Sequence, residues 1–198
     1  MSAPVGSRDL VFVYATGLAC LFFLGEPSRS LSYDVSMKIA LGADHAGFEL
    51  KNQIIRYLQQ EGFEVQDEGT NSAESVDYPD FARAVTNDVT QGRADLGILV
   101  CGTGIGMAIS ANKAPGIRAA NVHNRYEAQM SREHNDTNVL TLGARILKPE
   151  DALEIVDTWL STAFAGGRHQ RRVEKMMAIE KEQTLGEEAL SAFWETIG

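Results

Sequence analysis

Residues 95–113 read DLGILVCGTGIGMAISANK, and this stretch decides the fold. The run 96–100 is apolar without polar alternation, which is typical of a strand buried on both faces of a sheet. Residues 105–113 have the character of a helix, so the glycine-rich segment 101–106 connects a strand to a helix. Alternate glycines let the backbone turn tightly with its N–H groups outward, and the helix start adds partial positive charge. This segment therefore predicts an anion-binding turn.

Cys101 opens the turn. A thiol beside a helix N-terminus ionises more readily than a free thiol, so Cys101 is a candidate nucleophile or base. The other cysteine, Cys20, lies in a different context, and neither belongs to a spacing that is typical of metal ligands. The two cysteines therefore indicate a reducing compartment, and no metal site is expected.

Composition favours a single globular domain without a surface for nucleic acid or membrane. The chain has 198 residues, of which 44% are apolar and 23% charged, and this is enough material for one core. Its formal net charge of −9 repels nucleic acid and anionic lipid, and no stripe of lysine and arginine offsets it.

Residues 1–36 differ from the rest of the chain. Residues 10–25 are nearly all apolar, short for a membrane span and closer to a signal-peptide core, although no typical cleavage pattern follows. Three interpretations of this N-terminal extension stay open: translation begins at Met37, the segment is a targeting signal, or it is a folded addition. Residues 37–183 form the main domain, and 184–198 are a C-terminal appendix of unknown packing.

From Met37 onward, apolar runs alternate with helical patterns. The predicted strands are 38–44, 63–67, 96–100, 117–122 and 138–142, and the predicted helices are 48–60, 79–91, 105–113, 125–133, 149–164 and 168–182. Single helices between strands indicate βαβ units, whose right-handed crossovers produce a parallel sheet covered on both faces. We therefore predict an α/β fold with a doubly wound, five-stranded parallel sheet in a three-layer, Rossmann-like arrangement.

Ligands of such sheets bind beyond the carboxyl ends of the strands, where this chain places several polar residues. The nucleotide-binding fingerprints do not fit them, however. Residues 42–47 lack the middle glycine of the dinucleotide motif, and no Gly-Lys-Ser/Thr follows 102–106. Asp44 would also repel a phosphate. No nucleotide cofactor is therefore expected.

Residues 168–172, RHQRR, are the one basic cluster of this acidic chain. Arg168 and Arg172 are four residues apart and share a helix face, with His169 beside them. Such a group can surround a phosphate with charge-assisted hydrogen bonds. The alternative is a solvated helix start with ordinary surface arginines, but the acidic background favours the anion site.

Three further histidines have different surroundings. His45, beside Asp44 at a strand end, could bind phosphate or a sugar hydroxyl, or simply contact a helix N-terminus. His134, in the polar run EHNDTN, is the best candidate for proton transfer, with a helix C-terminal contact as the alternative. His123 follows the fourth strand without polar company and is interpreted as structural.

Together these parts suit the aldose–ketose isomerisation of a phosphosugar. That reaction needs a ring opener, a base that moves a proton between C1 and C2, donors for the enediolate oxygens and an anchor for the phosphate. It requires no redox cofactor.

From Met37 to about Gln183, the chain resembles the ribose/galactose isomerase family, and within it the B-type ribose-5-phosphate isomerases. The motifs that carry the resemblance are GADHAG (42–47), DYP (77–79), CGTGIG with its SANK sequel (101–113), GIRAA (116–120), REHNDTN (132–138), LGAR (142–145) and GGRHQRRVE (166–174). The resemblance implies a doubly wound domain that dimerises, with each active site built by two subunits and no metal.

The resemblance also implies a role for individual residues. Cys101 corresponds to the base that moves the C1/C2 proton, whereas some relatives use a glutamate at the position of Met107, which accepts no proton. The backbone N–H groups of the turn that would stabilise the enediolate belong to Gly102, Gly104, Ile105 and Gly106. The residues matching ring opening are Asp44, Thr103 and His134, and those matching sugar contacts are Tyr78 and Asn135. The phosphate set comprises His45, Arg145, Arg168, His169 and Arg172, part of it from the partner chain.

The expected function is the interconversion of D-ribose 5-phosphate and D-ribulose 5-phosphate through ring opening and a cis-enediolate, without a cofactor. We expect a cytoplasmic homodimer, with pairing of dimers into a tetramer as a further option. Two alternatives stay open: a hexose-6-phosphate isomerase acting on allose or galactose 6-phosphate, and a phosphosugar-binding protein without turnover. One extra carbon changes binding by only ~1–3 kcal/mol, so residue types alone do not separate pentose from hexose.

Overall fold

The computed structural model describes residues 36–182. The apolar segment 10–25, Cys20 and the C-terminal appendix 184–198 lie outside the described residues. Within the described range, no helix is both long and apolar enough to span a membrane.

The described residues contain one sheet of five parallel strands in the order β2-β1-β3-β5-β4. The strands are β1 (Lys38–Ala43), β2 (Glu64–Asp67), β3 (Leu96–Cys101), β4 (Ala119–Asn121) and β5 (Val139–Gly143). The helices are α1 (Phe48–Gln60), α2 (Tyr78–Thr90), α3 (Ile105–Ala111), α4 (Arg125–Asn135), α5 (Pro149–Ser161) and α6 (Arg168–Glu182). The predicted doubly wound α/β fold is confirmed.

The predicted bounds of β4 and α5 were too wide. β4 covers only residues 119–121 instead of 117–122. At its start, backbone N–H groups donate to side-chain amide oxygens instead of to the backbone of a neighbouring strand. The Asn138 Oδ1 atom accepts the Arg118 N–H at 2.8 Å, and the Asn112 Oδ1 atom accepts the Ala119 N–H at 2.8 Å. α5 ends at Ser161 instead of 164, because Thr162 turns to extended backbone with φ −91° and ψ 122°.

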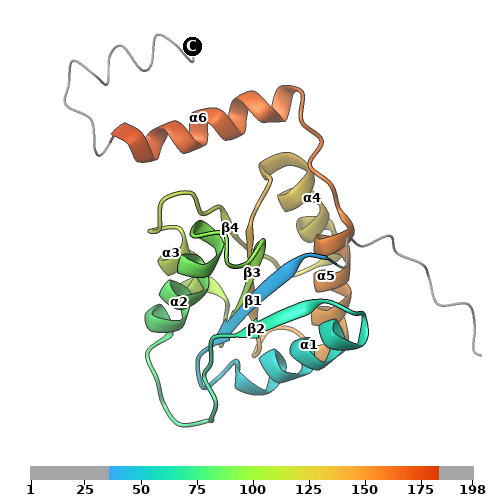
Figure 1. Cartoon of the computed structure of the whole chain (residues 1–198). Coiled ribbons are helices and arrows are strands. Elements are labelled where there is room, and N and C mark those ends of the chain that lie inside the picture. The colour runs from blue at the N-terminus through green and yellow to red at the C-terminus, as the bar shows by residue number, and fades with distance from the viewer. Residues whose placement is uncertain (1–35, 183–198) are drawn as a thin grey trace, which may run out of the picture. The chain divides into compact units, whose positions relative to one another are not determined.

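Helices cover both faces of the sheet, as Figure 1 shows, with α1 and α5 on one side and α2 and α3 on the other. Successive residues of β3 point to opposite faces. Ile98 and Val100 pack with the side chains of α1 and α5, whereas Leu99 and Cys101 pack with those of α2 and α3. The apolar run of β3 is therefore explained by burial on both faces.

The order of the strands places a switch point at β1 and β3. The chain leaves β1 to form β2 on one side and later returns to form β3 on the other. The loops after β1 and β3 consequently diverge, and open parallel sheets bind ligands in the crevice between such loops. Asp44 follows β1 and Cys101 ends β3, so both stand at this crevice.

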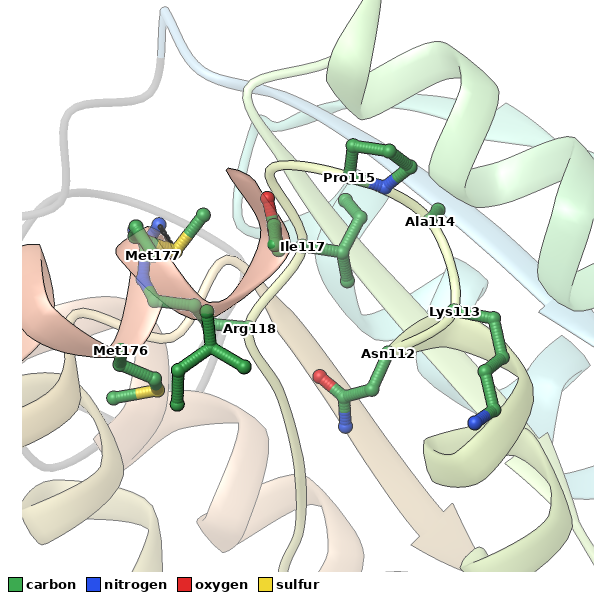
Figure 2. A pocket seen from close by; sticks show the side chains of 10 residues that line it. Asn112, Lys113, Ala114, Pro115, Ile117, Arg118, Met176 and Met177 are labelled. Atoms are coloured by element: carbon green, nitrogen blue, oxygen red, sulfur yellow. Dashed lines mark hydrogen bonds between the residues drawn. The ribbon is translucent and has the colours of Figure 1, made fainter. Parts of the chain in front are cut away.

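α6 lies beside α4 and the loop 112–118, away from α1 (Figure 1). Its carboxylate Glu180 Oε2 accepts the Gly116 N–H at 2.9 Å, and the Arg118 Nη1 atom lies 3.6 Å from the Met177 sulfur. An open groove of about 360 Å³ separates the helix from the loop; Figure 2 shows Met176 and Met177 on one side of it and the loop residues on the other. Glu180 and Met177 are therefore the α6 side chains that contact this loop through these two bonds.

Shortening a side chain of β3 should destabilise the fold. Ile98 is fully buried, so we expect Ile98→Ala to lower the free energy of unfolding by about 2–5 kcal/mol through lost burial and the cavity that remains. Urea denaturation measures this change. The matched control is Ile146→Ala, at a side chain that is 57% exposed, for which we expect a change below ~0.5 kcal/mol. Equal losses in the two variants would contradict burial as the cause.

Candidate active site

The carboxyl end of β1 presents Asp44 and His45. Asp44 is buried, and its Oδ1 atom accepts the N–H groups of Ala46 at 2.9 Å and Gly47 at 3.0 Å, so this carboxylate closes the turn into α1. The His45 Nδ1 atom accepts the Val76 N–H at 3.4 Å. Because Nδ1 is the acceptor, the neutral ring carries its proton on Nε2, where it can donate to a ligand.

Cys101 ends β3 and is 5% exposed. Its sulfur accepts the N–H of Gly104 at 3.1 Å, so a backbone N–H of the predicted turn points at the thiol itself. Gly104 has the left-handed φ of +79°, and a side chain there would collide with the Asn121 amide. Only glycine fits this position, and the turn is consequently closed tightly around the sulfur.

Two side chains of the predicted site lie directly on the turn 101–106. A Cβ atom added to Gly106 would come within 2.9 Å of the Tyr78 ring, and one added to Gly102 would lie 3.4 Å from the Arg145 guanidinium. The Thr103 hydroxyl accepts the Ile105 N–H at 3.4 Å at the start of α3. The loops of the carboxyl edge thus bring an aromatic ring, a cation and a hydroxyl together beside Cys101.

A second group of predicted residues gathers where α4 ends and α6 begins. The imidazole rings of His134 and His169 stack with their centroids 4.2 Å apart and their planes 4° from parallel. The Arg168 Nε atom donates to His169 Nε2 at 3.3 Å. Asn135 is the last residue of α4, and Arg172 lies one turn along α6 from Arg168. The predicted basic cluster therefore meets the predicted proton-transfer histidine within one subunit.

Burial and the surrounding charges favour the neutral form of the His169 imidazole. Burial lowers the pKa of His169 below its usual value, and the neighbouring His134, Arg168 and Arg172 lower it further, while Glu133 acts in the opposite direction. A neutral ring can accept the Arg168 hydrogen bond at Nε2 and donate from Nδ1.

The sequence interpretation missed the residue that holds the end of α4. Asp136 adopts a left-handed φ of 46°, and the Arg118 guanidinium donates to the carbonyls of Asn135 at 3.2 Å and Asp136 at 2.8 Å. Arg118 also pairs with the Asp136 carboxylate at 3.0 Å. Its position within the GIRAA motif was the available signal, but only the structure shows which backbone it binds.

His123 was wrongly interpreted as lacking polar company. Its backbone N–H donates to Glu127 Oε2 at 2.7 Å, its Nδ1 atom lies 3.3 Å from the same oxygen, and its Nε2 atom lies 3.5 Å from the Asn121 amide nitrogen. The backbone hydrogen bond lowers the pKa of Glu127, so the carboxylate stays ionised. The spacing of four residues between His123 and Glu127 was the available signal, but only the structure shows that their polar atoms meet.

The two groups of site residues lie at opposite edges of the sheet. Asp44 and Cys101 follow the carboxyl ends of β1 and β3, whereas α4 leads His134 and Asn135 into the amino end of β5. β5 has five residues and spans roughly 16 Å, at ~3.3 Å per residue. The run 132–138 therefore lies at the amino edge, apart from the carboxyl-edge residues of the same subunit.

Among residues 36–182, no three side chains of histidine, cysteine, aspartate or glutamate gather as metal ligands would. Cys101 is a free thiol.

The pKa of His169 makes stability depend on pH. Because this pKa is lowered in the folded chain, the unfolded chain binds more protons than the folded chain at acidic pH. The contribution of His169 to the free energy of unfolding is therefore highest at neutral pH and decreases as the pH falls through the usual titration range of histidine. We expect His169→Gln to lose less free energy of unfolding than the wild type between pH 7.5 and pH 5.5. Urea titrations at both pH values measure the difference, and identical losses would contradict a lowered pKa.

Comparison with known proteins identifies the family. Residues 39–176 match the model of the Ribose/Galactose Isomerase family. Ribose-5-phosphate isomerase B of Escherichia coli (strain K12) is 53% identical over 144 residues, which are 73% of this chain and 97% of that protein.

Solved structures agree. A ribose-5-phosphate isomerase B of Clostridium thermocellum has a TM-score of 0.74 at 54% identity, covering 74% of this chain and 99% of that one. The enzyme of Mycoplasma genitalium, solved with bound ribulose-5-phosphate, has a TM-score of 0.72 at 42% identity, covering 75% and 99%. The chain belongs to the ribose/galactose isomerase family.

Proposed function

We propose that this chain interconverts D-ribose 5-phosphate and D-ribulose 5-phosphate by moving a proton between C1 and C2 of the open sugar. The observation that carries the proposal is the Cys101 sulfur, held 3.1 Å from the Gly104 N–H in a turn flanked by Arg145 and Tyr78. Membership of the family and the relative that binds ribulose-5-phosphate support the substrate class.

In this proposal Cys101 is the base. As a thiolate, the sulfur that accepts the Gly104 N–H takes the C2 proton of the open aldose and returns it to C1, while the O2 hydroxyl proton passes to O1. Negative charge then develops on the sugar oxygens, and the backbone N–H groups of 102–106 bind it as an oxyanion hole does. Met107, where some relatives place a glutamate, is fully buried and carries no group that could replace the thiol.

Ring opening precedes this step and needs proton transfer at the ring oxygen and the C1 hydroxyl. We assign it to Asp44, Thr103 and His134, with Tyr78 and Asn135 contacting the sugar. Tyr78 is 40% exposed beside the turn, so its ring can cover a bound sugar. The phosphate is assigned to His45 and Arg145 at the carboxyl edge together with Arg168, His169 and Arg172 on α6.

These assignments require two subunits. Asp44 and Cys101 stand at one edge of the sheet, and His134 and Asn135 at the other, so a complete site forms only where the edges of two copies meet. Exposed apolar side chains flank the turn: Ile105 is 54% and Ile109 59% exposed, and they lie one helical turn apart on α3. We therefore propose a homodimer with two shared sites. The free Cys101 thiol supports a reducing, cytoplasmic location.

Removing the thiol should abolish most turnover. We expect Cys101→Ala to lower kcat for ribose 5-phosphate by about 10²–10⁴-fold, the usual contribution of a general base. NMR in deuterated water follows both the conversion and the exchange at C2, with allose 6-phosphate as a second substrate. Cys20→Ala, which changes the other cysteine and none of the assigned residues, is the matched control. A Cys101→Ala enzyme with most of its kcat would disprove the base, and a preference for allose 6-phosphate would disprove the pentose substrate.

Mixing two inactive variants should restore activity if the sites are shared. In a dimer of one Cys101→Ala and one His134→Ala subunit, one site carries both changes and the other carries neither. Random pairing therefore yields about a quarter of the wild-type number of intact sites. Unfolding and refolding an equimolar mixture, followed by the isomerase assay, measures the recovery, and each variant refolded alone is the control. Absence of recovery in refolded mixed dimers would show that each site lies within one subunit.

A further inference from the structure

Asn121, the last residue of β4, contacts the turn that carries Cys101. Its Nδ2 atom donates to the Thr103 carbonyl at 3.4 Å, and its Oδ1 atom accepts the Thr141 hydroxyl at 3.3 Å. The same oxygen lies so close to Gly104 that no side chain would fit there. The Asn121 amide thus lies between β5 and the turn and is hydrogen-bonded to both.

The Thr103 carbonyl that Asn121 binds and the Gly104 N–H that points at Cys101 belong to one peptide group. This group is planar, so fixing its oxygen also fixes the direction of its N–H. The N–H donates to the Cys101 sulfur at 3.1 Å. A hydrogen bond to the carbonyl also polarises the peptide and strengthens the donation from its nitrogen. Asn121 therefore acts on the thiol through a single peptide.

The orientation of the Asn121 amide is set on both sides. Thr141 is fully buried on β5, and its hydroxyl fixes the oxygen end of the amide. The nitrogen end lies 3.5 Å from His123 Nε2, whose ring is tied to Glu127 through Nδ1. With Nδ1 donating to the carboxylate, Nε2 is free to accept from the amide.

We propose that Asn121 is a positioning residue for the Cys101 thiol: it orients the Thr103–Gly104 peptide so that its N–H stabilises the negatively charged sulfur. The effect on the thiol stands by itself, and only its consequence for turnover rests on the proposed role of Cys101 as the base.

The test is the rate at which iodoacetamide alkylates Cys101 in the folded full chain, followed by mass spectrometry of the Cys101 peptide. Asn121→Asp keeps the shape and the acceptor for Thr141 but turns an oxygen toward the Thr103 carbonyl, so the peptide loses its anchor. We expect alkylation at pH 7.5 about tenfold slower than in the wild type, as for a weakened hydrogen bond to a charged group. The difference should shrink as the pH rises, because alkali ionises the thiol in both proteins.

Asn112→Asp is the matched control. Asn112 also binds β4, accepting the Ala119 N–H at 2.8 Å and donating to the Ala119 carbonyl at 2.9 Å, but it has no hydrogen bond to the turn 101–106. We expect its alkylation rate within about twofold of the wild type. Asn121→Leu, which fills the same space without a donor, should slow alkylation as Asn121→Asp does and replaces it if the latter does not fold. Unchanged rates in the Asn121 variants would overturn the proposal.

Turnover separates this inference from the role of Cys101. If Cys101 is the base, kcat for ribose 5-phosphate should fall about tenfold in Asn121→Asp while KM stays within about twofold, because the proposed sugar and phosphate contacts are untouched. Slower alkylation with unchanged kcat would support Asn121 as the residue that positions the thiol and would instead disprove Cys101 as the base.

Discussion

The burial of β3 on both faces is the constraint on which the rest of the molecule depends. Ile98, Leu99 and Val100 have no exposed surface, and β1 and β5 pair with β3 on either side. The strand therefore has no freedom to shift, and the turn that follows it starts from a fixed point. The turn is also held from β5, since a Cβ atom on Gly143 would lie 2.8 Å from the Thr103 backbone. A thiol at this place is oriented by the core itself.

Because all strands of the sheet run in the same direction, residues that follow a strand and residues that end a helix lie at opposite edges. Every strand ends at the same edge, so Asp44 and Cys101 become neighbours, and every preceding helix ends at the opposite edge, where His134 lies. The short loops at each edge do not reach across the length of the strands to bring the two groups together. Symmetry offers the remaining way to combine the two groups, because two copies related by a twofold axis can present different edges to each other. In this view the proposed dimer is a consequence of strand direction.

Positive charge is concentrated at the start of α6, where the sequence is RHQRR. Burial and the neighbouring arginines lower the pKa of His169, whose ring stacks on His134. Arg118 ties the end of α4 to α6 through Asp136 and Met177. The cluster thus places two arginines beside imidazole rings that can donate hydrogen bonds, a combination that can bind an anion.

The sequence by itself determined the helices and strands of the fold and the family to which the chain belongs. Helices 48–60 and 168–182 have the predicted bounds, and β3 with its glycine turn was predicted from one stretch, because periodicity and turn composition are local properties. The family motifs then supplied roles for residues such as Cys101 and His134.

Only the tertiary structure decided which of these residues meet. Segments far apart in the chain are joined by the strand order β2-β1-β3-β5-β4, by the stacking of His134 on His169 and by the hydrogen bond from Asn121 to the Thr103 carbonyl. The same holds for the separation of His134 from Cys101. Such contacts depend on how strands pair and helices pack, and no local pattern encodes the partner of a side chain whose neighbours arrive from another part of the sequence.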